Sequence, residues 1–182
     1  MANALTLARI ALIAPFAAMF FIAAPWSMSA ALALFALAAL TDLFDGMAAR
    51  SMGRVTALGA ALDPLADKML IAAALILLTR NGVIRDAGVI AALVILMREL
   101  FVGGMREAVG QKGERLPVTA LAKVKAMTQF VAIALLLAAA PGGVGGEAMR
   151  PLAAAVFWFA AILTLWTGVD YGARAVRILR SV

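Results

Sequence analysis

The segment that decides the fold lies between two long apolar stretches and reads TDLFDGMAARSMGRVTALGAALDPLADK over residues 41–68. It holds four of the ten acidic residues in the 182-residue chain. The flanking residues 10–40 and 69–79 carry no charged side chain. Because a carboxylate beside hydrocarbon is energetically costly, four of them at the junction of two apolar stretches indicate a functional site.

The composition of the chain is that of a membrane protein. Hydrophobic residues make up 65% of it and charged residues 14%, with a mean hydropathy of +1.03. Soluble domains are about half apolar and a quarter charged, so we expect the excess apolar surface to face lipid. The length suits one domain covering residues 1–182. The first apolar stretch has no small-residue cleavage site and is predicted to be a membrane helix, not a signal peptide.

Apolar stretches long enough to cross a bilayer recur between polar or turn-forming breaks. A hydrocarbon core of about 30 Å requires about 20 helical residues. The sequence therefore predicts an all-α integral membrane protein with six transmembrane helices. Their predicted ranges are 5–24, 28–49, 57–79, 87–109, 118–140 and 151–172.

The basic residues predict the orientation of these six helices. An even number of spans places both termini on one side of the membrane. Of the 16 Lys and Arg residues, only Arg80, Arg85 and Arg150 lie near the opposite face. The positive-inside rule then predicts that both termini, and the junction between the second and third helices, are cytoplasmic. The net charge of +6 is explained by contact with anionic lipid, so no nucleic-acid partner is predicted.

The chain contains neither cysteine nor histidine. Disulfides, thiol nucleophiles, imidazole general bases and zinc-finger sites are therefore excluded. A metal site would have to be built from oxygen ligands, which suit Mg²⁺, Mn²⁺ or Ca²⁺.

The four acidic residues of the deciding segment form two pairs at helical spacing. Asp42 and Asp45 lie about 60° apart around a helix, and Gly59, Asp63 and Asp67 fall within about 80° of arc. Two antiparallel helices joined by a short turn can direct these stripes toward each other. Four facing carboxylates would repel one another, and two divalent cations would remove that repulsion. Such a site suits phosphoryl transfer assisted by two metals.

Two other interpretations of these carboxylates stay open at this point. An Asp pair at a helix end is often a cap or part of a solvated surface. Aspartates inside a membrane can also line a cation pathway, which would make the protein a divalent-cation transporter.

The complete spacing reads Asp42-x2-Asp45-Gly46-x2-Ala49-Arg50-x8-Gly59-x3-Asp63-x3-Asp67. It resembles the signature of the CDP-alcohol phosphotransferase family at all eight fixed positions. Flanking sequence is similar to a bacterial branch of that family whose acceptor is glycerol-3-phosphate. The similar segments are Leu5-Thr6-Leu7-Ala8-Arg9, Arg98-Glu99 and Arg106-Glu107.

The fifth predicted helix departs from that branch. It carries Ala122-Lys123-Val124-Lys125-Ala126 where the branch commonly has Gly-Lys-x-Lys-Thr. The departure bears on the acceptor and leaves the reaction class unchanged. Inositol phosphate, serine or another phospholipid are therefore alternative acceptors.

The resemblance implies transfer of the phosphatidyl group of CDP-diacylglycerol to glycerol-3-phosphate, with release of CMP. It implies that the four aspartates hold two Mg²⁺ or Mn²⁺ ions and that Asp67 is also the general base. It further implies that Thr6, Gly46, Arg50 and Thr56 line the cytidine diphosphate. A multi-pass homodimer in the bacterial inner membrane, with an active site between helices two and three facing the cytoplasm, is expected.

A phosphorylated acceptor needs cations close to the cytoplasmic surface. The candidates are Arg98, Arg106, Lys123 and Lys125. Lys123 and Lys125 lie about 200° apart on a helix and are not expected to face one site, so Lys125 is preferred together with Arg106. The alternative for each is a side chain that extends to lipid headgroups.

Overall fold

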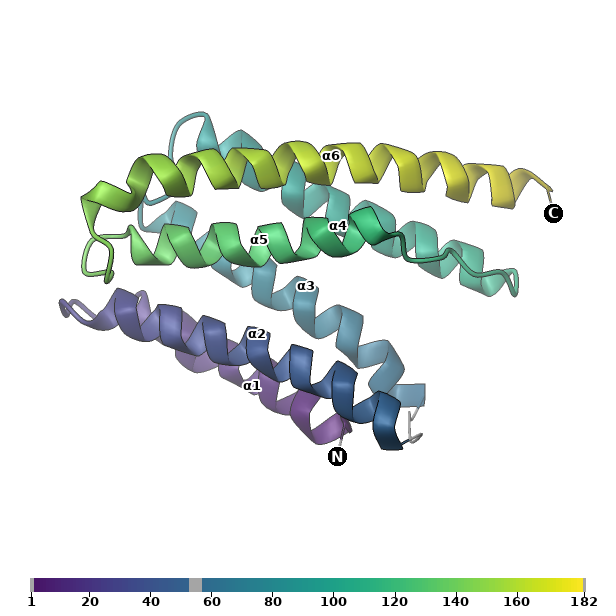
Figure 1. Ribbon diagram of the computed structural model, residues 1–182, viewed down its shortest axis with the longest axis horizontal. Helices are drawn as coiled ribbons and strands as arrows, with labels where there is room; N and C mark the ends of the chain where they lie inside the picture. Colours follow the sequence, from purple (N-terminus) through teal and green to yellow (C-terminus); the bar gives the residue numbers. More distant parts are fainter. Residues whose placement is uncertain (1, 53–56, 182) are drawn as a thin grey trace. The chain divides into compact units, whose positions relative to one another are not determined.

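The computed structural model describes residues 2–52 and 57–181, and the side chains of residues 6–41, 62 and 64–180. The described chain is helical and contains no strand (Figure 1). Its elements in order are α1 (Ala2–Met19), α2 (Ser27–Met52), α3 (Ala57–Arg80), α4 (Gly88–Gln111), α5 (Ala120–Ala138), the short 3₁₀ helix η1 (Glu147–Met149) and α6 (Arg150–Ser181).

Each α-helix overlaps one predicted span, and the largest differences lie at the two ends of the series. α1 ends at Met19, five residues before the predicted boundary, and a turn follows it. α6 continues to Ser181, nine residues past the predicted boundary. Its last turns carry Arg174, Arg177 and Arg180, which do not suit hydrocarbon but are compatible with helix. Hydropathy therefore located the apolar part of α6 and not the end of the helix.

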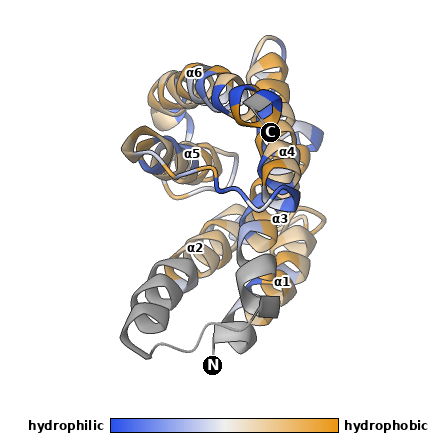
Figure 2. Ribbon diagram, turned by 90° about the vertical axis from the view of Figure 1, so that its right-hand side faces the viewer, coloured by the Kyte–Doolittle hydropathy of each residue, from blue (hydrophilic) through white to orange (hydrophobic). Residues whose placement is uncertain are grey.

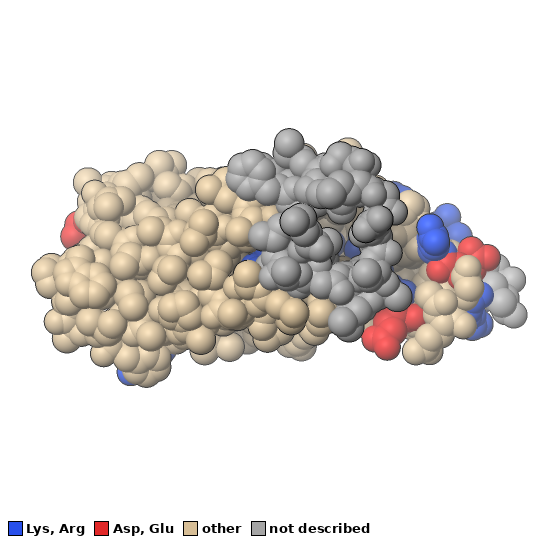
Figure 3. Space-filling model, turned by 90° about the horizontal axis from the view of Figure 1, so that it is seen from below, with Lys and Arg blue, Asp and Glu red and all other residues tan. Residues whose placement is uncertain are grey.

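Three described helical segments are long and apolar enough to cross a membrane: Gly88–Gln111, Ala120–Ala138 and Glu147–Arg180. Thr6–Met19 and Ser27–Thr41 are shorter apolar helices. Large apolar side chains such as Met97 and Trp166 are exposed on the long helices. Figure 2 shows apolar colouring along much of the described helices, and on the face drawn in Figure 3 most described side chains are uncharged, with the charged ones mainly toward one end. An exposed apolar surface of this extent indicates a protein embedded in lipid.

The chain divides into two compact units. The first comprises Met1–Ile84 and Ile133–Ala153, and the second comprises Arg85–Ala132 and Ala154–Val182. In the first unit α1 packs against both α2 and α3. The ring of Phe16 lies 5.3 Å from that of Phe20 and 6.0 Å from that of Phe35. Fully buried alanines, including Ala31 and Ala66, allow these helices to approach closely.

In the second unit, α4 packs against α6 at two glycines of α6, Gly168 and Gly172. A Cβ atom built on Gly168 would lie 2.8 Å from Cγ of Arg98, and one on Gly172 would lie 3.1 Å from Cε1 of Phe101. Such distances are shorter than ordinary contacts, so glycine at these positions leaves room for the α4 side chains. The Gly168 position in particular provides space for a charged side chain inside the unit.

Candidate active site

The backbone places the two aspartate pairs on successive helices. Asp42 and Asp45 belong to α2, whereas Asp63 and Asp67 belong to α3, and only residues 53–56 separate these helices. Helix on both sides of a short junction is what the spacing predicted. The side chains of Asp42, Asp45, Arg50 and Asp63, the surroundings of Gly46, and the whole of Thr56 lie outside what the structure describes. Their convergence on two metal ions therefore stays a prediction.

Asp67 is the one member of the aspartate motif whose side chain is described. Arg9 of α1 donates a hydrogen bond from Nη1 to Oδ1 of Asp67 over 3.1 Å. The Arg9 side chain is 0% exposed, whereas that of Asp67 is 35% exposed. A buried guanidinium requires a carboxylate partner, and Asp67 supplies it while remaining open to solvent. The ion pair therefore fixes the direction of a partly accessible carboxylate.

The sequence interpretation included Arg9 in a motif but did not predict its partner. One feature of the sequence could have indicated a carboxylate partner, because Arg9 is the only charged residue among the first 40. A lone cation in an apolar helix is expected to pair with a carboxylate on a neighbouring helix. Thr6, predicted to line the cytidine diphosphate, lies one turn before Arg9 and is buried.

If the protein performs the reaction that the sequence resemblance implies, replacing Arg9 by glutamine is expected to lower kcat for CMP release by about tenfold, because Asp67 would lose the charged hydrogen bond that orients its carboxylate. The KM values for both substrates should change little. Arg9→Lys restores the charge and is expected to recover part of the rate. Steady-state kinetics of the three proteins would test this. A rise in KM with unchanged kcat would contradict a positioning role for Arg9.

A second polar cluster lies inside the second unit, centred on Glu99 of α4. Its Oε1 atom accepts hydrogen bonds from Nη1 of Arg98 over 3.3 Å, from Nε2 of Gln129 over 3.4 Å, and from Nζ of Lys125. Lys125 and Gln129 are contributed by α5 and are buried. One carboxylate oxygen therefore holds the charged groups of two helices together.

The third helix of this cluster, α6, contributes Tyr171. The Tyr171 hydroxyl donates to the carbonyl of Pro117 over 3.0 Å and accepts from the backbone N–H of Thr119 over 2.9 Å. Its ring lies beneath two guanidinium groups, with Cζ of Arg98 at 5.6 Å and Cζ of Arg106 at 5.3 Å from the ring centroid. These hydrogen bonds tie the Tyr171 hydroxyl to the α4–α5 connection, and cation–π attraction to the ring holds both arginines beside α6. Nη2 of Arg106 also lies 3.5 Å from the Tyr171 hydroxyl.

Two α6 threonines extend the cluster. Nη2 of Arg98 donates to Oγ1 of Thr167 over 3.3 Å, and Nε2 of Gln129 donates to Oγ1 of Thr164 over 3.0 Å. The Nε atom of Arg98 is buried and has no hydrogen-bond partner among the described residues. No motif in the sequence pointed to α6. Its contribution arises from Thr164, Thr167 and Tyr171, which are three and four residues apart on the helix and belong to no recognised motif.

The structure brings three of the four predicted acceptor-binding cations together. Arg98 and Lys125 share Glu99, and Arg106 joins them through Tyr171. Lys123 is exposed and makes none of these contacts, as its angular separation from Lys125 predicts. Two cations paired with one carboxylate, and a third beside Tyr171, leave an excess of positive charge in the cluster. Such a cluster is suited to binding an anion, above all a phosphate group with several acceptor oxygens.

Comparison with known proteins agrees with the family resemblance of the aspartate motif. The family model described as CDP-alcohol phosphatidyltransferase matches residues 1–166. A protein of Rickettsia bellii is 37% identical over 169 residues, covering 93% of this chain and 91% of its own. A Cereibacter sphaeroides protein is 36% identical, covering 98% and 96%, and a Shigella flexneri protein is 38% identical, covering 92% and 90%. All three carry the name CDP-diacylglycerol–glycerol-3-phosphate 3-phosphatidyltransferase.

Proposed function

Because this chain belongs to the CDP-alcohol phosphatidyltransferase family, we propose that it performs the reaction for which its relatives are named. It is a transferase of phospholipid biosynthesis that moves the phosphatidyl group of CDP-diacylglycerol to glycerol-3-phosphate and releases CMP. The observation that carries this conclusion is identity of 36–38% along nearly the full length of both chains. The relatives' names give no support to the divalent-cation transporter considered from the sequence.

The reaction requires a group that accepts the proton of the acceptor hydroxyl, and we assign this role to Asp67. In a chain without histidine, a partly exposed carboxylate directed by a buried arginine is suited to the task. The hydroxyl oxygen then attacks the β-phosphorus of CDP-diacylglycerol, the bond from that phosphorus to the bridging oxygen breaks, and CMP leaves. No covalent intermediate with the protein is needed.

Two divalent cations, Mg²⁺ or Mn²⁺, would be held by Asp42, Asp45, Asp63 and Asp67. This all-oxygen donor set fits such ions, and the exposure of Asp67 leaves its carboxylate accessible to one. Ions held there would supply Lewis-acid activation of the acceptor hydroxyl and stabilisation of the negative charge on the departing CMP. Gly46, Arg50 and Thr56, with Thr6, are assigned to the cytidine diphosphate.

The acceptor phosphate is assigned to the cations of the second unit, namely Lys125, Arg98 and Arg106. Their positions are set by Glu99 and Tyr171 before any ligand arrives. Preorganised donors of this kind bind phosphate without first losing side-chain freedom. Lys123, exposed on the other side of α5, is assigned to lipid headgroups.

In the membrane we propose six spans, with both termini and the aspartate motif at the cytoplasmic face of a bacterial inner membrane. The support is the agreement between six observed helices and six predicted spans, together with the bias of basic residues to one side. We also propose that the protein works as a homodimer, as the family resemblance suggests.

The proposed reaction can be tested with the purified protein, CDP-diacylglycerol, Mg²⁺ and a panel of acceptors, with CMP release as the readout. Glycerol-3-phosphate is expected to give the highest rate, and a chelator should abolish it. No CMP release with both substrates present would overturn the proposal. A faster rate with inositol phosphate or serine would keep the chemistry and correct the acceptor.

A further inference from the structure

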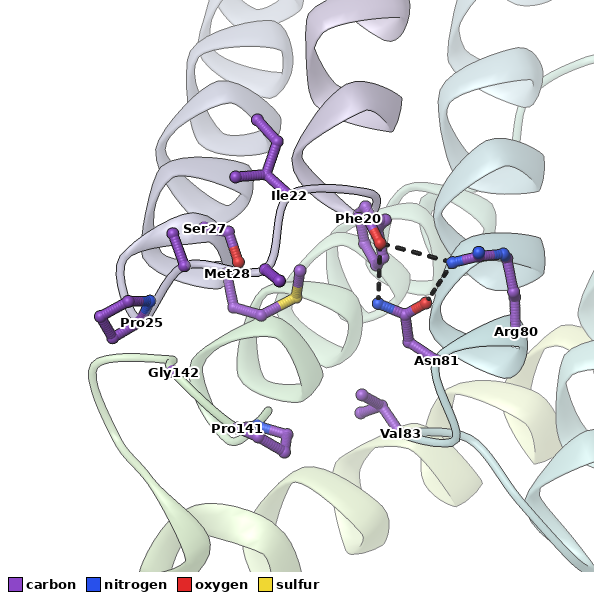
Figure 4. Close-up of a pocket in the computed structure, with 12 residues that line it drawn as sticks. Phe20, Ile22, Pro25, Ser27, Met28, Arg80, Asn81, Val83, Pro141 and Gly142 are labelled. Carbon is purple, nitrogen blue, oxygen red and sulfur yellow. Dashed lines mark hydrogen bonds between the residues drawn. The ribbon is translucent and has the colours of Figure 1, made fainter.

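The first unit contains a pocket of about 620 Å³ at one end of its helices (Figure 4). Three connections line it. Phe20 and Pro25 come from the α1–α2 connection, Arg80 and Asn81 from the end of α3 and the residue after it, and Pro141 and Gly142 from the segment after α5. None of these residues was singled out as a site residue by the sequence.

This pocket is separate from the proposed chemistry. Arg80 is the last residue of α3, and Asp67 lies 13 positions earlier on the same helix. At about 1.5 Å per residue, roughly 20 Å of helix separates them. The pocket therefore cannot share a small ligand with Asp67.

Arg80 is held in place beside the pocket with most of its donors available. Its guanidinium Cζ lies 4.1 Å from the ring centroid of Phe21, and Nη1 donates to Oδ1 of Asn81 over 2.9 Å and to the carbonyl of Phe20 over 3.4 Å. A guanidinium has five N–H donors, and those on Nε and Nη2 meet no acceptor among the described residues. No described carboxylate pairs with it either. The guanidinium of Arg80 is thus held in a fixed position by Phe21, Asn81 and Phe20, and its remaining N–H donors are able to bind an anion.

The wall opposite Arg80 is fixed by a tight turn. Gly142 has a φ of +80°, and a Cβ atom there would lie 2.7 Å from the Pro25 carbonyl oxygen. Ser29 donates its hydroxyl hydrogen to the carbonyl of Gly142 over 2.9 Å. The pocket is therefore bounded by constrained backbone. Phe21 is 65% exposed and provides an apolar surface next to the cation, and Trp26, beside the Pro25 wall of the pocket, is 55% exposed.

We propose that this pocket binds the phosphodiester head of a membrane phospholipid, with the phosphate at Arg80. The acyl chains would then lie along the exposed side chains of Phe21, Ile22 and Trp26. A guanidinium recognises phosphate through paired N–H donors, and aromatic side chains such as Trp26 are suited to the headgroup level of a bilayer. A soluble phosphate ester would use the cation and leave the apolar surface uncovered. In the proposed topology the ligand belongs to the leaflet opposite the aspartate motif.

The test is retention of phosphatidylglycerol by the full-length protein in neutral detergent, measured by native mass spectrometry during a lipid titration. Arg80→Gln should weaken binding of one lipid about tenfold, because a charged hydrogen-bond donor is lost. The matched control is Arg85→Gln. Arg85 is an exposed arginine outside the pocket whose side chain lies 4.0 Å from Asp86. The Arg85→Gln protein should bind the lipid as tightly as the unmodified protein does.

Arg80→Lys keeps the positive charge and is expected to bind within about threefold of the unmodified protein, so it tests the site even if Arg80→Gln folds poorly. CMP release by Arg80→Gln should be unchanged, which separates this proposal from the proposed reaction. Equal lipid retention by Arg80→Gln and the unmodified protein would overturn the proposal. Stabilisation of the unmodified protein by inorganic phosphate as strong as that by the lipid would also overturn it.

Discussion

Asp67→Asn is expected to reduce CMP release by about a thousandfold or more, the range over which a general base contributes to a rate. Asparagine keeps the size and one oxygen of the side chain but cannot accept the proton of the acceptor hydroxyl. It also removes one charge from the proposed metal ligands. The measurement is kcat with saturating CDP-diacylglycerol and glycerol-3-phosphate. Binding of CDP-diacylglycerol should largely remain, because the cytidine diphosphate is assigned to other residues.

A matched control is Asp170→Asn. Asp170 lies on α6 and pairs with Arg174 over 3.0 Å at the surface, so its replacement should leave the rate within about twofold. Because Arg9 loses its anionic partner in Asp67→Asn, thermal unfolding of both variants must accompany the kinetics. Near-normal turnover by a folded Asp67→Asn protein would remove Asp67 from its assigned role.

Lys125→Ala is expected to raise the KM for glycerol-3-phosphate by about 10- to 100-fold, the value of one hydrogen bond from a charged donor. The buried ammonium group of Lys125 is one of the three cations assigned to the acceptor phosphate. The KM for CDP-diacylglycerol should change little. Initial rates over a range of acceptor concentrations give both values.

Lys123→Ala provides the comparison, because it removes the same side chain from the exposed side of the same helix. It should leave the acceptor KM unchanged. Slow turnover with unphosphorylated glycerol offers a further control, since a specific loss of phosphate binding affects only the phosphorylated acceptor. Equal losses with both acceptors, or equal effects of the two lysine replacements, would contradict the assignment.

The positions of the helices, and the helix face on which some residues lie, could be predicted from the sequence because both depend on local patterns. Runs of apolar residues located all six α-helices of the described residues, and the 100° turn per residue placed Lys123 and Lys125 on different sides of α5. The end of α6 was not predictable from hydropathy, because a helix continues into water when its residues favour it.

The pairings between helices could not be predicted in this way. Arg9 and Asp67 are 58 positions apart, and Arg106 and Tyr171 are 65 apart. Their contacts depend on how helices pack, which no local spacing records. Tyr171 in particular sits in a segment with no recognisable pattern, although its hydroxyl and ring organise much of the cationic cluster.

The single Glu99 oxygen shared by Arg98, Lys125 and Gln129 has a consequence for selectivity. Glu99 already accepts one hydrogen bond from each of these side chains, so an incoming anion that replaces it gains only the difference between its own attraction and that of Glu99. Chloride or a simple carboxylic acid offers little advantage over the resident group. A doubly charged phosphate ester offers more charge and more oxygens, and it can bind where these weaker competitors are rejected.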